Sequence, residues 1–254
     1  MNDDALLGMR ALVTGAGSGI GAASAVALAD AGARVAAADL HLDSANATVA
    51  SIDGGIAVRC DVADEASVAA AVRTTVEAFG GMDVLVTCAG ITLPGRTADT
   101  TLDEWRTVID VNLTGTFLAI RESIPYLRAS KTPAIVTIGS VASLVAAGSS
   151  ASYNASKGAV LQLTRAVAAE YAAEGIRANC VCPGLVRTNL AANSERVRGA
   201  PTAPPETAGL KARPPMSRTS EPEEIAAVVA FLCAPAASFM TGAAVPVDGG
   251  YTAT

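Results

Sequence analysis

The glycine-rich stretch 14-TGAGSGIGAA-23 lies between an apolar run and a helical pattern, and this arrangement indicates the fold. The run RALVTG (10–15) is short and mostly apolar, which predicts a buried strand, and SGIGAASAVALADAG (18–32) predicts a helix that ends at Gly32. Glycines let the backbone turn tightly and approach a pyrophosphate, which the free N–H groups of a helix N-terminus bind. The stretch therefore predicts a phosphate-binding turn.

An acid on the second predicted strand strengthens this interpretation. Read as G-x-G-x-x-[GA], the turn supplies Gly17, Gly19 and Ala22, which alone is weak because glycines also mark ordinary strand–helix turns. Asp39 lies near the end of RVAAADL (34–40), about twenty residues further on, where an acid binds the ribose of adenosine. Taken alone, Asp39 also fits a helix cap. Strand, turn, helix, strand and acid together predict dinucleotide binding.

Short apolar strands alternate with amphipathic helices along the whole chain. This alternation predicts an α/β fold with one doubly wound parallel sheet, a Rossmann fold, and helices on both faces. No stretch resembles a linker, so we expect residues 1–254 to form a single domain. Further strands are predicted at 55–62, 82–90, 133–140, 176–184 and 243–250, and further helices at 64–81, about 102–127, 152–175 and 221–235.

Composition limits the partners and the compartment. The 254 residues carry a formal net charge of −6, which argues against a nucleic-acid partner. The N-terminus MNDDALLGMR is acidic and does not fit a secretory signal, and no uninterrupted apolar stretch reaches the roughly 18 residues of a membrane helix. We therefore expect a cytoplasmic protein with no membrane contact.

The five cysteines are an odd and scattered set, which is a poor disulfide framework. Cys180 and Cys182 would share one face of a strand, and the single histidine, His41, is far from them in sequence. We expect buried structural thiols rather than a metal or redox site, in a reducing compartment. His41 itself is expected to be a surface residue in a loop.

The stretch 151-ASYNASKGAV-160 places Tyr153 and Lys157 four positions apart in a predicted helix, so their side chains share one face. With one histidine in the chain, the usual general acid and base is nearly absent. A phenol with a pKa of about 10 is a poor base, but a nearby cation favours the phenolate. An isolated pair of this kind would be an ordinary solvated helix face.

The segment 189–220 breaks the alternation, because it is rich in proline and glycine. A loop of this length in a compact domain is functional or disordered, and it follows the carboxyl end of a predicted strand, where ligands of such sheets bind. We predict a substrate lid, with a variable surface insertion as the alternative. Lys211 and Arg213 in this segment are ordinary solvated charges or, alternatively, contacts for an anionic group of the substrate.

In these motifs the sequence resembles the short-chain dehydrogenase/reductase family over nearly its whole length. The family's T-G-x-x-x-G-x-G motif matches residues 14–21 and assigns Gly15, Gly19 and Gly21, one frame away from the generic pattern. The Y-x-x-x-K pair matches Tyr153 and Lys157. The resemblance assigns the remaining two catalytic positions to Ser140 in TIGSVAS and Asn112 in DVNLTGTF.

The resemblance also implies the residues that bind the cofactor. The acid–aliphatic pair beside adenine matches Asp61 and Val62, the P-G after the sixth strand matches Pro183 and Gly184, and Thr188 occupies the position that touches the nicotinamide carboxamide. One departure is plain: the family's N-N-A-G is here 87-TCAG-90, so both asparagines are lost while Ala-Gly is kept. The implied set further includes Ser18, Ile20, Cys88, Gly90 and Val186, with Tyr153 and Lys157.

The implied activity is NAD-dependent interconversion of a secondary alcohol and a ketone. Tyr153 would exchange the hydroxyl proton, Ser140 would orient the oxygen, Lys157 would bind the nicotinamide ribose, and Asn112 would hold a water that relays protons. Asp39, with no basic residue at 16–18, favours NAD over NADP. Within the family, a 3-oxoacyl thioester (acyl-carrier-protein) reductase and a cis-dihydrodiol dehydrogenase stay open, and a non-catalytic NAD-bound sensor is the alternative from another class.

The family commonly assembles as homotetramers. The resemblance implies contacts through the helices at 102–127 and 152–173 and through the C-terminal strand, and the alanine-rich run AVAAEYAAEG (166–175) would let a neighbouring helix approach closely. Alanine-rich helices also pack within monomers, so this expectation follows from the resemblance and not from the composition.

Overall fold

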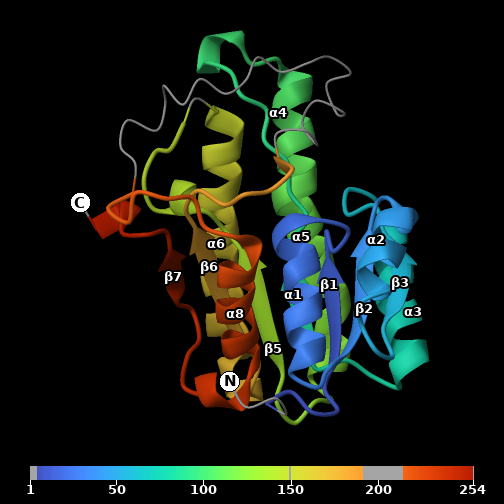
Figure 1. Cartoon of the computed structure of the whole chain (residues 1–254). Helices are drawn as coiled ribbons and strands as arrows, with labels where there is room; N and C mark the ends of the chain where they lie inside the picture. Colours follow the sequence, from blue (N-terminus) through green and yellow to red (C-terminus); the bar gives the residue numbers. More distant parts are fainter. Residues whose placement is uncertain (1–4, 149, 191–213, 254) are drawn as a thin grey trace.

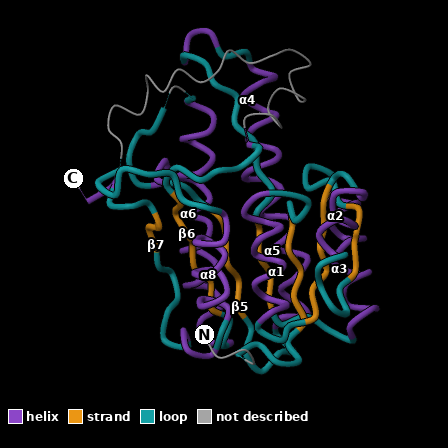
Figure 2. The backbone as a smooth tube through the Cα atoms, viewed as in Figure 1, coloured by secondary structure: helices purple, strands orange, loops and turns teal. Residues whose placement is uncertain are grey.

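The computed structural model describes residues 5–148, 150–190 and 214–253. Its centre is a sheet of seven parallel strands in the order β3-β2-β1-β4-β5-β6-β7, which Figure 2 shows in orange between the helices. Strands β2 and β3 follow β1 toward one side of the sheet and β4 to β7 toward the other, so the strand order reverses between β1 and β4. The strands are β1 (Arg10–Thr14), β2 (Arg34–Asp39), β3 (Ile56–Arg59), β4 (Val84–Thr87), β5 (Ala134–Ile138), β6 (Arg177–Pro183) and β7 (Ala244–Val247).

Helices cover both faces of this sheet (Figure 1). One face carries α1 (Gly19–Asp30), α2 (Leu42–Val49) and α8 (Pro222–Cys233), and the other carries α3 (Glu65–Phe79), α5 (Gly115–Leu127) and α6 (Ala151–Tyr171). Helix α4 (Leu102–Ile109) extends beyond the sheet and leads into α5. Short 3₁₀ turns are η1 (Thr97–Asp99), η3 (Val141–Ser143), η4 (Ala172–Glu174), η6 (Pro235–Ala237) and η7 (Tyr251–Ala253).

Alternate residues of each central strand belong to two separate cores. In β1, Ala11 and Val13 pack with α1 and α8, whereas Leu12 packs with α3 and α5. All three side chains are buried, because in a parallel sheet covered on both faces neither side of the pleat meets water. The predicted α/β doubly wound fold is confirmed.

Two elements differ from the expectation. Helix α2 was not predicted, because LDSANATV is short and its mainly small and polar residues give only a weak helical pattern. The long helix expected over 102–127 is present but contains a π-helical turn, η2 (Asp110–Thr114), between α4 and α5. This turn holds Asn112, and π-helical turns often accompany functional sites.

Most of the predicted lid lies outside the described residues, including Lys211 and Arg213. Its described C-terminal end, residues 214–220, is fixed to the body of the protein. The backbone at Ser220 pairs with the backbone at Val186, and the Met216 N–H donates to the Gly249 carbonyl over 3.1 Å. Within the described part of the chain, no helix is both long and apolar enough to span a bilayer.

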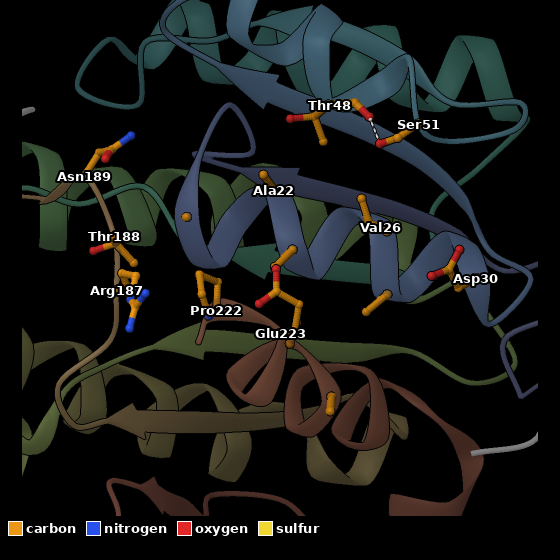
Figure 3. Close-up of a pocket in the computed structure, with 15 residues that line it drawn as sticks. Ala22, Val26, Asp30, Thr48, Ser51, Arg187, Thr188, Asn189, Pro222 and Glu223 are labelled. Carbon is orange, nitrogen blue, oxygen red and sulfur yellow. Dashed lines mark hydrogen bonds between the residues drawn. The ribbon is translucent and has the colours of Figure 1, made fainter. Parts of the chain in front are cut away.

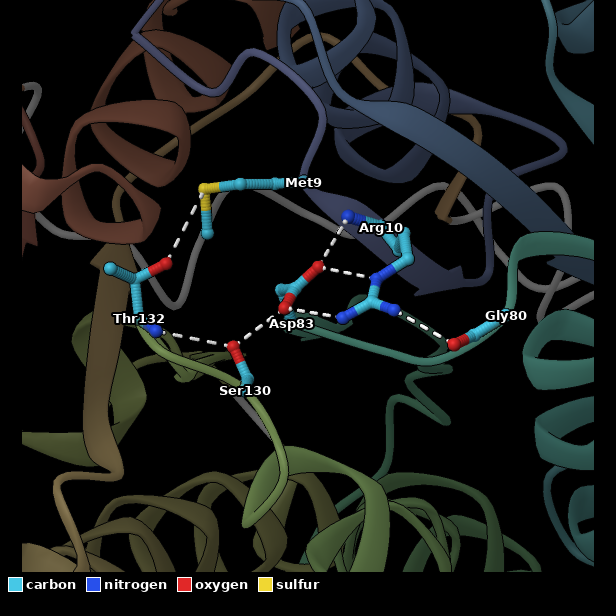
Figure 4. A network of polar contacts seen from close by, with 6 residues as sticks. All are labelled: Met9, Arg10, Gly80, Asp83, Ser130 and Thr132. Atoms are coloured by element: carbon cyan, nitrogen blue, oxygen red, sulfur yellow. Dashed lines mark hydrogen bonds and ion pairs between the residues drawn. The ribbon is translucent and has the colours of Figure 1, made fainter.

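A polar network joins the amino ends of three strands, at the edge of the sheet opposite the glycine turn (Figure 4). The Arg10 guanidinium donates to both carboxylate oxygens of Asp83, over 2.7 and 2.9 Å, and the Arg10 N–H donates to the same group. The Ser130 hydroxyl adds a fourth hydrogen bond of 2.6 Å. Burial raises the pKa of Asp83, but these hydrogen bonds outweigh it, so the pKa lies below its ordinary value.

We therefore expect Asp83→Asn to lower the free energy of unfolding by about 1–3 kcal/mol near neutral pH. Because the folded-state pKa of Asp83 is depressed, its contribution is present above the unfolded-state pKa of about 3.9 and is lost as pH falls through the folded-state value. Urea unfolding at a series of pH values measures this: the difference from the wild type should shrink in strong acid.

Glu65→Gln is the matched control, because Glu65 pairs with Arg121 at the exposed surface. Because water screens such exposed pairs, they contribute little to stability, so Glu65→Gln should lower the free energy of unfolding much less than Asp83→Asn does. Equal losses in the two variants would contradict the importance given to the Asp83 network.

Candidate active site

A pocket of about 620 Å³ opens at the carboxyl ends of the strands. It extends across the point between β1 and β4 where the strand order reverses, which is where open α/β sheets bind ligands. The structure brings together in its wall every residue assigned above to cofactor binding: Gly15, Ser18, Gly19, Ile20, Gly21, Asp39, Asp61, Val62, Cys88, Gly90, Tyr153, Lys157, Pro183, Gly184, Val186 and Thr188. Ser140 lines it as well, whereas Asn112 is fully buried beside it.

The glycine turn has the frame that the family motif gives. Gly15 has a φ of +66°, and a Cβ there would lie 2.6 Å from the backbone of Ala89. Gly19 has a φ of +53°, and its Cβ would meet the Thr188 side chain at 3.1 Å. Any side chain at these two positions would be strained and would narrow the pocket, so the turn suits a ligand that approaches the backbone closely.

Asp39 ends β2 in the wall of this pocket. One carboxylate oxygen accepts from the Gly17 N–H over 2.9 Å and the other from the His41 N–H over 3.0 Å. A Cβ on Gly17 would lie 2.7 Å from the Asp39 carboxyl carbon, so glycine at 17 is what lets the carboxylate reach the turn. Among the described residues that line the pocket, Lys157 is the only lysine or arginine. His41 is exposed, as expected, but it also lies at the pocket rim.

Three elements bring the four predicted catalytic residues together. Ser140 follows β5, Tyr153 and Lys157 lie one turn apart on α6, and Asn112 lies in η2. The Lys157 ammonium is 5.8 Å from the centre of the Tyr153 ring. A Cβ on Gly90 would be 3.4 Å from Asn112 Oδ1 and 3.5 Å from Lys157 Nζ, so these two groups face the same glycine.

The environment of Tyr153 favours the neutral phenol. Burial raises its pKa above the ordinary value, and a hydrogen bond with the Ser140 hydroxyl acts in the opposite direction but is the smaller effect. Lys157 is not among the groups that move this pKa, so the lowering expected from the i+4 spacing is not seen. Burial also lowers the pKa of Lys157, against smaller opposing effects of Cys180, Cys88 and Cys182.

Lys157 and Asn112 are held by backbone groups that carry no sequence signature. Lys157 Nζ donates to the Ile138 carbonyl over 2.7 Å. The Asn112 side chain accepts from the Ile91 N–H over 2.8 Å and donates to the Ile91 carbonyl and to the Ser156 hydroxyl. Asn112 thus joins the segment after β4 to α6. Its amide N–H groups are both used within the protein, so its side chain positions the backbone of the site.

Cys88 occupies the place of a family asparagine in the pocket wall. Burial raises the pKa of its thiol to about 12, so it stays protonated and inert. Its N–H donates to the Thr14 carbonyl over 3.1 Å, which keeps the end of β4 against β1. The family asparagine is therefore replaced by a small thiol without loss of the backbone pairing.

All five cysteines are free, and all except the half-buried Cys88 are buried. Cys180 and Cys182 share one face of β6, as predicted, with their sulfur atoms 4.0 Å apart. In the described parts of the chain, no group of three or more histidine, cysteine, aspartate or glutamate side chains is placed to hold a metal ion.

A second groove of about 530 Å³ lies beside the glycine turn, between α1 and the start of α8 (Figure 3). It shares Gly19, Thr188 and Asn189 with the larger pocket. Five of its fifteen lining residues are alanines, and its charged lining residues are Asp30, Arg187 and Glu223. None of the four predicted catalytic residues lines it, so we place the candidate active site in the larger pocket.

Known proteins match this chain over nearly its full length. The family profile described as Enoyl-(Acyl carrier protein) reductase matches residues 15–252. Cis-4-hydroxycyclohexanecarboxylate dehydrogenase from Sinomonas cyclohexanicum is 42% identical over 247 residues, 96% of each chain. Meso-2,3-butanediol dehydrogenase from Serratia marcescens is 38% identical over 245 residues, 96% of this chain and 94% of that protein. The crystal structure of levodione reductase has a TM-score of 0.89 at 33% identity and covers 98% of this chain and 99% of its own.

Fold, pocket and matches together define an oxidoreductase with a nicotinamide dinucleotide, NAD or NADP, as its cofactor. The chain belongs to the short-chain dehydrogenase/reductase family.

Proposed function

We propose that this protein is an NAD-dependent dehydrogenase that interconverts a secondary alcohol and a ketone. The observation that carries the proposal is that Ser140, Tyr153 and Lys157 line the same 620 Å³ pocket, with the Lys157 ammonium 5.8 Å from the centre of the Tyr153 ring. Relatives whose names state a hydroxylated ring acid and a diol as substrates support a CH–OH donor. The pocket combines aliphatic side chains with the hydroxyls of Ser140 and Tyr153, which suits a small organic substrate.

The residues of the pocket fit a nicotinamide dinucleotide. The backbone around Gly15, Gly19 and Gly21 would hold the pyrophosphate, Asp39 the adenosine ribose, and Lys157 the second ribose. Further contacts would come from the adenine pair Asp61 and Val62 and from the strand ends with Cys88, Gly90, Pro183, Gly184, Val186 and Thr188, with Ser18 and Ile20 in the turn. When bound, this cofactor supplies the hydride acceptor for alcohol oxidation.

Tyr153 then acts as the base that takes the proton of the substrate hydroxyl, or as the acid that returns it to a ketone. Ser140 donates a hydrogen bond to the same oxygen and fixes its position. Because burial keeps the phenol neutral near pH 7, Tyr153 is ready to donate a proton, and as a base it works better when the pH is raised.

This arrangement makes a prediction about pH. Alcohol oxidation should accelerate as pH rises, because it needs the phenolate, and Ser140→Ala should shift that rise to higher pH, since it removes the hydrogen bond that lowers the pKa of Tyr153. We also expect turnover to fall about tenfold from the lost hydrogen bond to the substrate oxygen. The measurement is kcat against pH for wild type and variant. An unchanged pH profile in Ser140→Ala would count against the coupling of the two hydroxyls.

A screen of alcohols separates this proposal from its alternatives. Purified protein is assayed by NADH absorbance against secondary alcohols, ring diols and hydroxy acids with NAD, and against a 3-oxoacyl thioester with NADH and NADPH. Rapid oxidation of an alcohol supports the proposal. Activity confined to the thioester with NADPH would favour the 3-oxoacyl thioester reductase that the sequence left open. Tight NADH binding without turnover of any substrate would favour a sensor.

We further propose a cytoplasmic homotetramer of one-domain subunits, with 189–220 as the lid. Large apolar side chains that are at least partly exposed on the proposed contact elements support the assembly: Leu102 and Trp105 on α4, Phe117 on α5, and Phe239 close to β7. Light scattering coupled to size-exclusion chromatography tests it, and a mass near 25.3 kDa would contradict it.

A further inference from the structure

The 3₁₀ turn η3 carries a serine, Ser143, that contacts two of the proposed catalytic residues at once. Its hydroxyl donates to the Lys157 carbonyl over 2.7 Å. The same oxygen accepts from the Ser140 N–H over 3.2 Å. Ser143 is half-buried, and neither the spacing of residues nor the family motif singled it out. A single hydroxyl therefore joins the segment that carries Ser140 to the helix that carries Tyr153 and Lys157.

These two hydrogen bonds act on the parts of the site that need fixed geometry. The Ser140 side chain is already oriented by the Ala142 N–H, which donates to its oxygen over 3.1 Å, and Ser143 restrains the backbone on the other side. Lys157 is held at both ends by this one segment, at Nζ by the Ile138 carbonyl and at its own carbonyl by Ser143. Movement of η3 would consequently move Ser140 relative to α6.

The side of this serine that faces Gly139 is closely packed. A Cβ on Gly139 would lie 2.8 Å from Ser143 Oγ and 2.7 Å from Cys180 Sγ. Both distances are too short for a real contact, so glycine at 139 is what admits the hydroxyl between the strand and α6. Ser143 and the thiol of Cys180 thus pack closely around Gly139, the residue before Ser140.

We propose that Ser143 is a positioning residue that sets the distance between the Ser140 hydroxyl and the Tyr153–Lys157 pair. The proposal deepens the proposed function and rests on it. It goes beyond the four family positions, because Ser143 is not among the residues that line the pocket and acts through Ser140 and Lys157. Its loss lets Ser140 drift from Tyr153, so the pKa of Tyr153 rises further, since the hydrogen bond that lowers it weakens.

The test compares Ser143→Ala, Ser143→Thr and Ser130→Ala with wild type in alcohol oxidation. Ser130 is a matched control, because its hydroxyl also donates one hydrogen bond and accepts another, to Asp83 and from the Thr132 N–H, but at the opposite edge of the sheet. We expect Ser143→Ala to lower kcat about tenfold, with the KM for NAD within twofold, and to shift the pH profile of kcat upward. Ser143→Thr keeps the hydroxyl and should recover most of the turnover.

Ser130→Ala should lower the melting temperature without moving kcat or its pH profile. A kcat within twofold of wild type in Ser143→Ala would overturn the inference, as would equal losses in the alanine and threonine variants or an unmoved pH profile. Tyr153→Phe, assayed in parallel, distinguishes failure of the proposed function from failure of this inference. Normal turnover in Tyr153→Phe rejects the proposed function. An inactive Tyr153→Phe together with a normal Ser143→Ala rejects only the role of Ser143.

Discussion

Tyr153→Phe should lower turnover about a hundredfold or more while the protein folds and binds NADH as before. The substitution removes one oxygen from the half-buried ring and leaves its packing in place. The variant loses the group that we propose exchanges a proton with the substrate oxygen. The histidine that lines the described part of the pocket, His41, lies beside Asp39 and so cannot replace it. The measurements are kcat for an alcohol and fluorescence titration with NADH.

Lys157→Met is the companion variant. The Lys157 ammonium of the wild type donates to the Ile138 carbonyl, and Lys157 lines the pocket. We therefore expect Lys157→Met to weaken NADH binding as well as lower turnover, whereas Tyr153→Phe should lower turnover alone. The melting temperature of both variants shows whether each is folded. Near-normal turnover in a folded Tyr153→Phe would remove the acid–base assignment.

Wild-type protein should prefer NAD over NADP by about a hundredfold or more in kcat/KM. Asp39 is fixed at the pocket wall by the Gly17 and His41 N–H groups, so it cannot easily move aside for a phosphate on the 2′ oxygen. Such a phosphate carries nearly two negative charges and would face a like charge at close range. Arg34, the arginine nearest in sequence, starts β2 at the opposite end of the strand, and Arg59, which is paired in register with Asp39 at the end of β3, is not among the residues that line the pocket.

The double variant Asp39→Ser, Leu40→Arg should narrow or reverse this preference. Leu40 is exposed beside the pocket, so an arginine there can reach a phosphate without disturbing the core. Arg34→Ala is the control, because Arg34 packs over Phe79 and donates to the Ala78 carbonyl, remote from the pocket, and its cofactor ratio should match wild type. A wild-type preference for NADP on the same alcohol would show that Asp39 does not meet the ribose.

Much of the fold could be predicted because its information is local. Strands such as ALV in β1 are apolar on both faces, and the helices that follow have amphipathic spacing, so alternation alone indicated a parallel sheet. The turn residues Gly15 and Gly19 could also be found from the sequence, since a positive φ and a close backbone approach select glycine directly. The helix α2 was missed, because most of its eight residues are small or polar and give only a weak helical pattern, and in the structure it packs against β2 and β3.

The candidate residues of the site could be identified from the amino-acid sequence alone: the glycine turn, Asp39 and Ser140 after their strands, and the Tyr153–Lys157 pair on a helix. How these residues act together depends on the tertiary structure. The direction of the Tyr153 pKa shift follows from burial, which no i+4 spacing reveals, and here burial outweighs the Ser140 hydrogen bond. Lys157 donates a hydrogen bond to the Ile138 carbonyl and accepts one from the Ser143 hydroxyl, and both bonds require that the strand and the helix pack together. Spacing along the chain specifies which groups share a face, whereas desolvation and backbone hydrogen bonds depend on what the rest of the chain places around them.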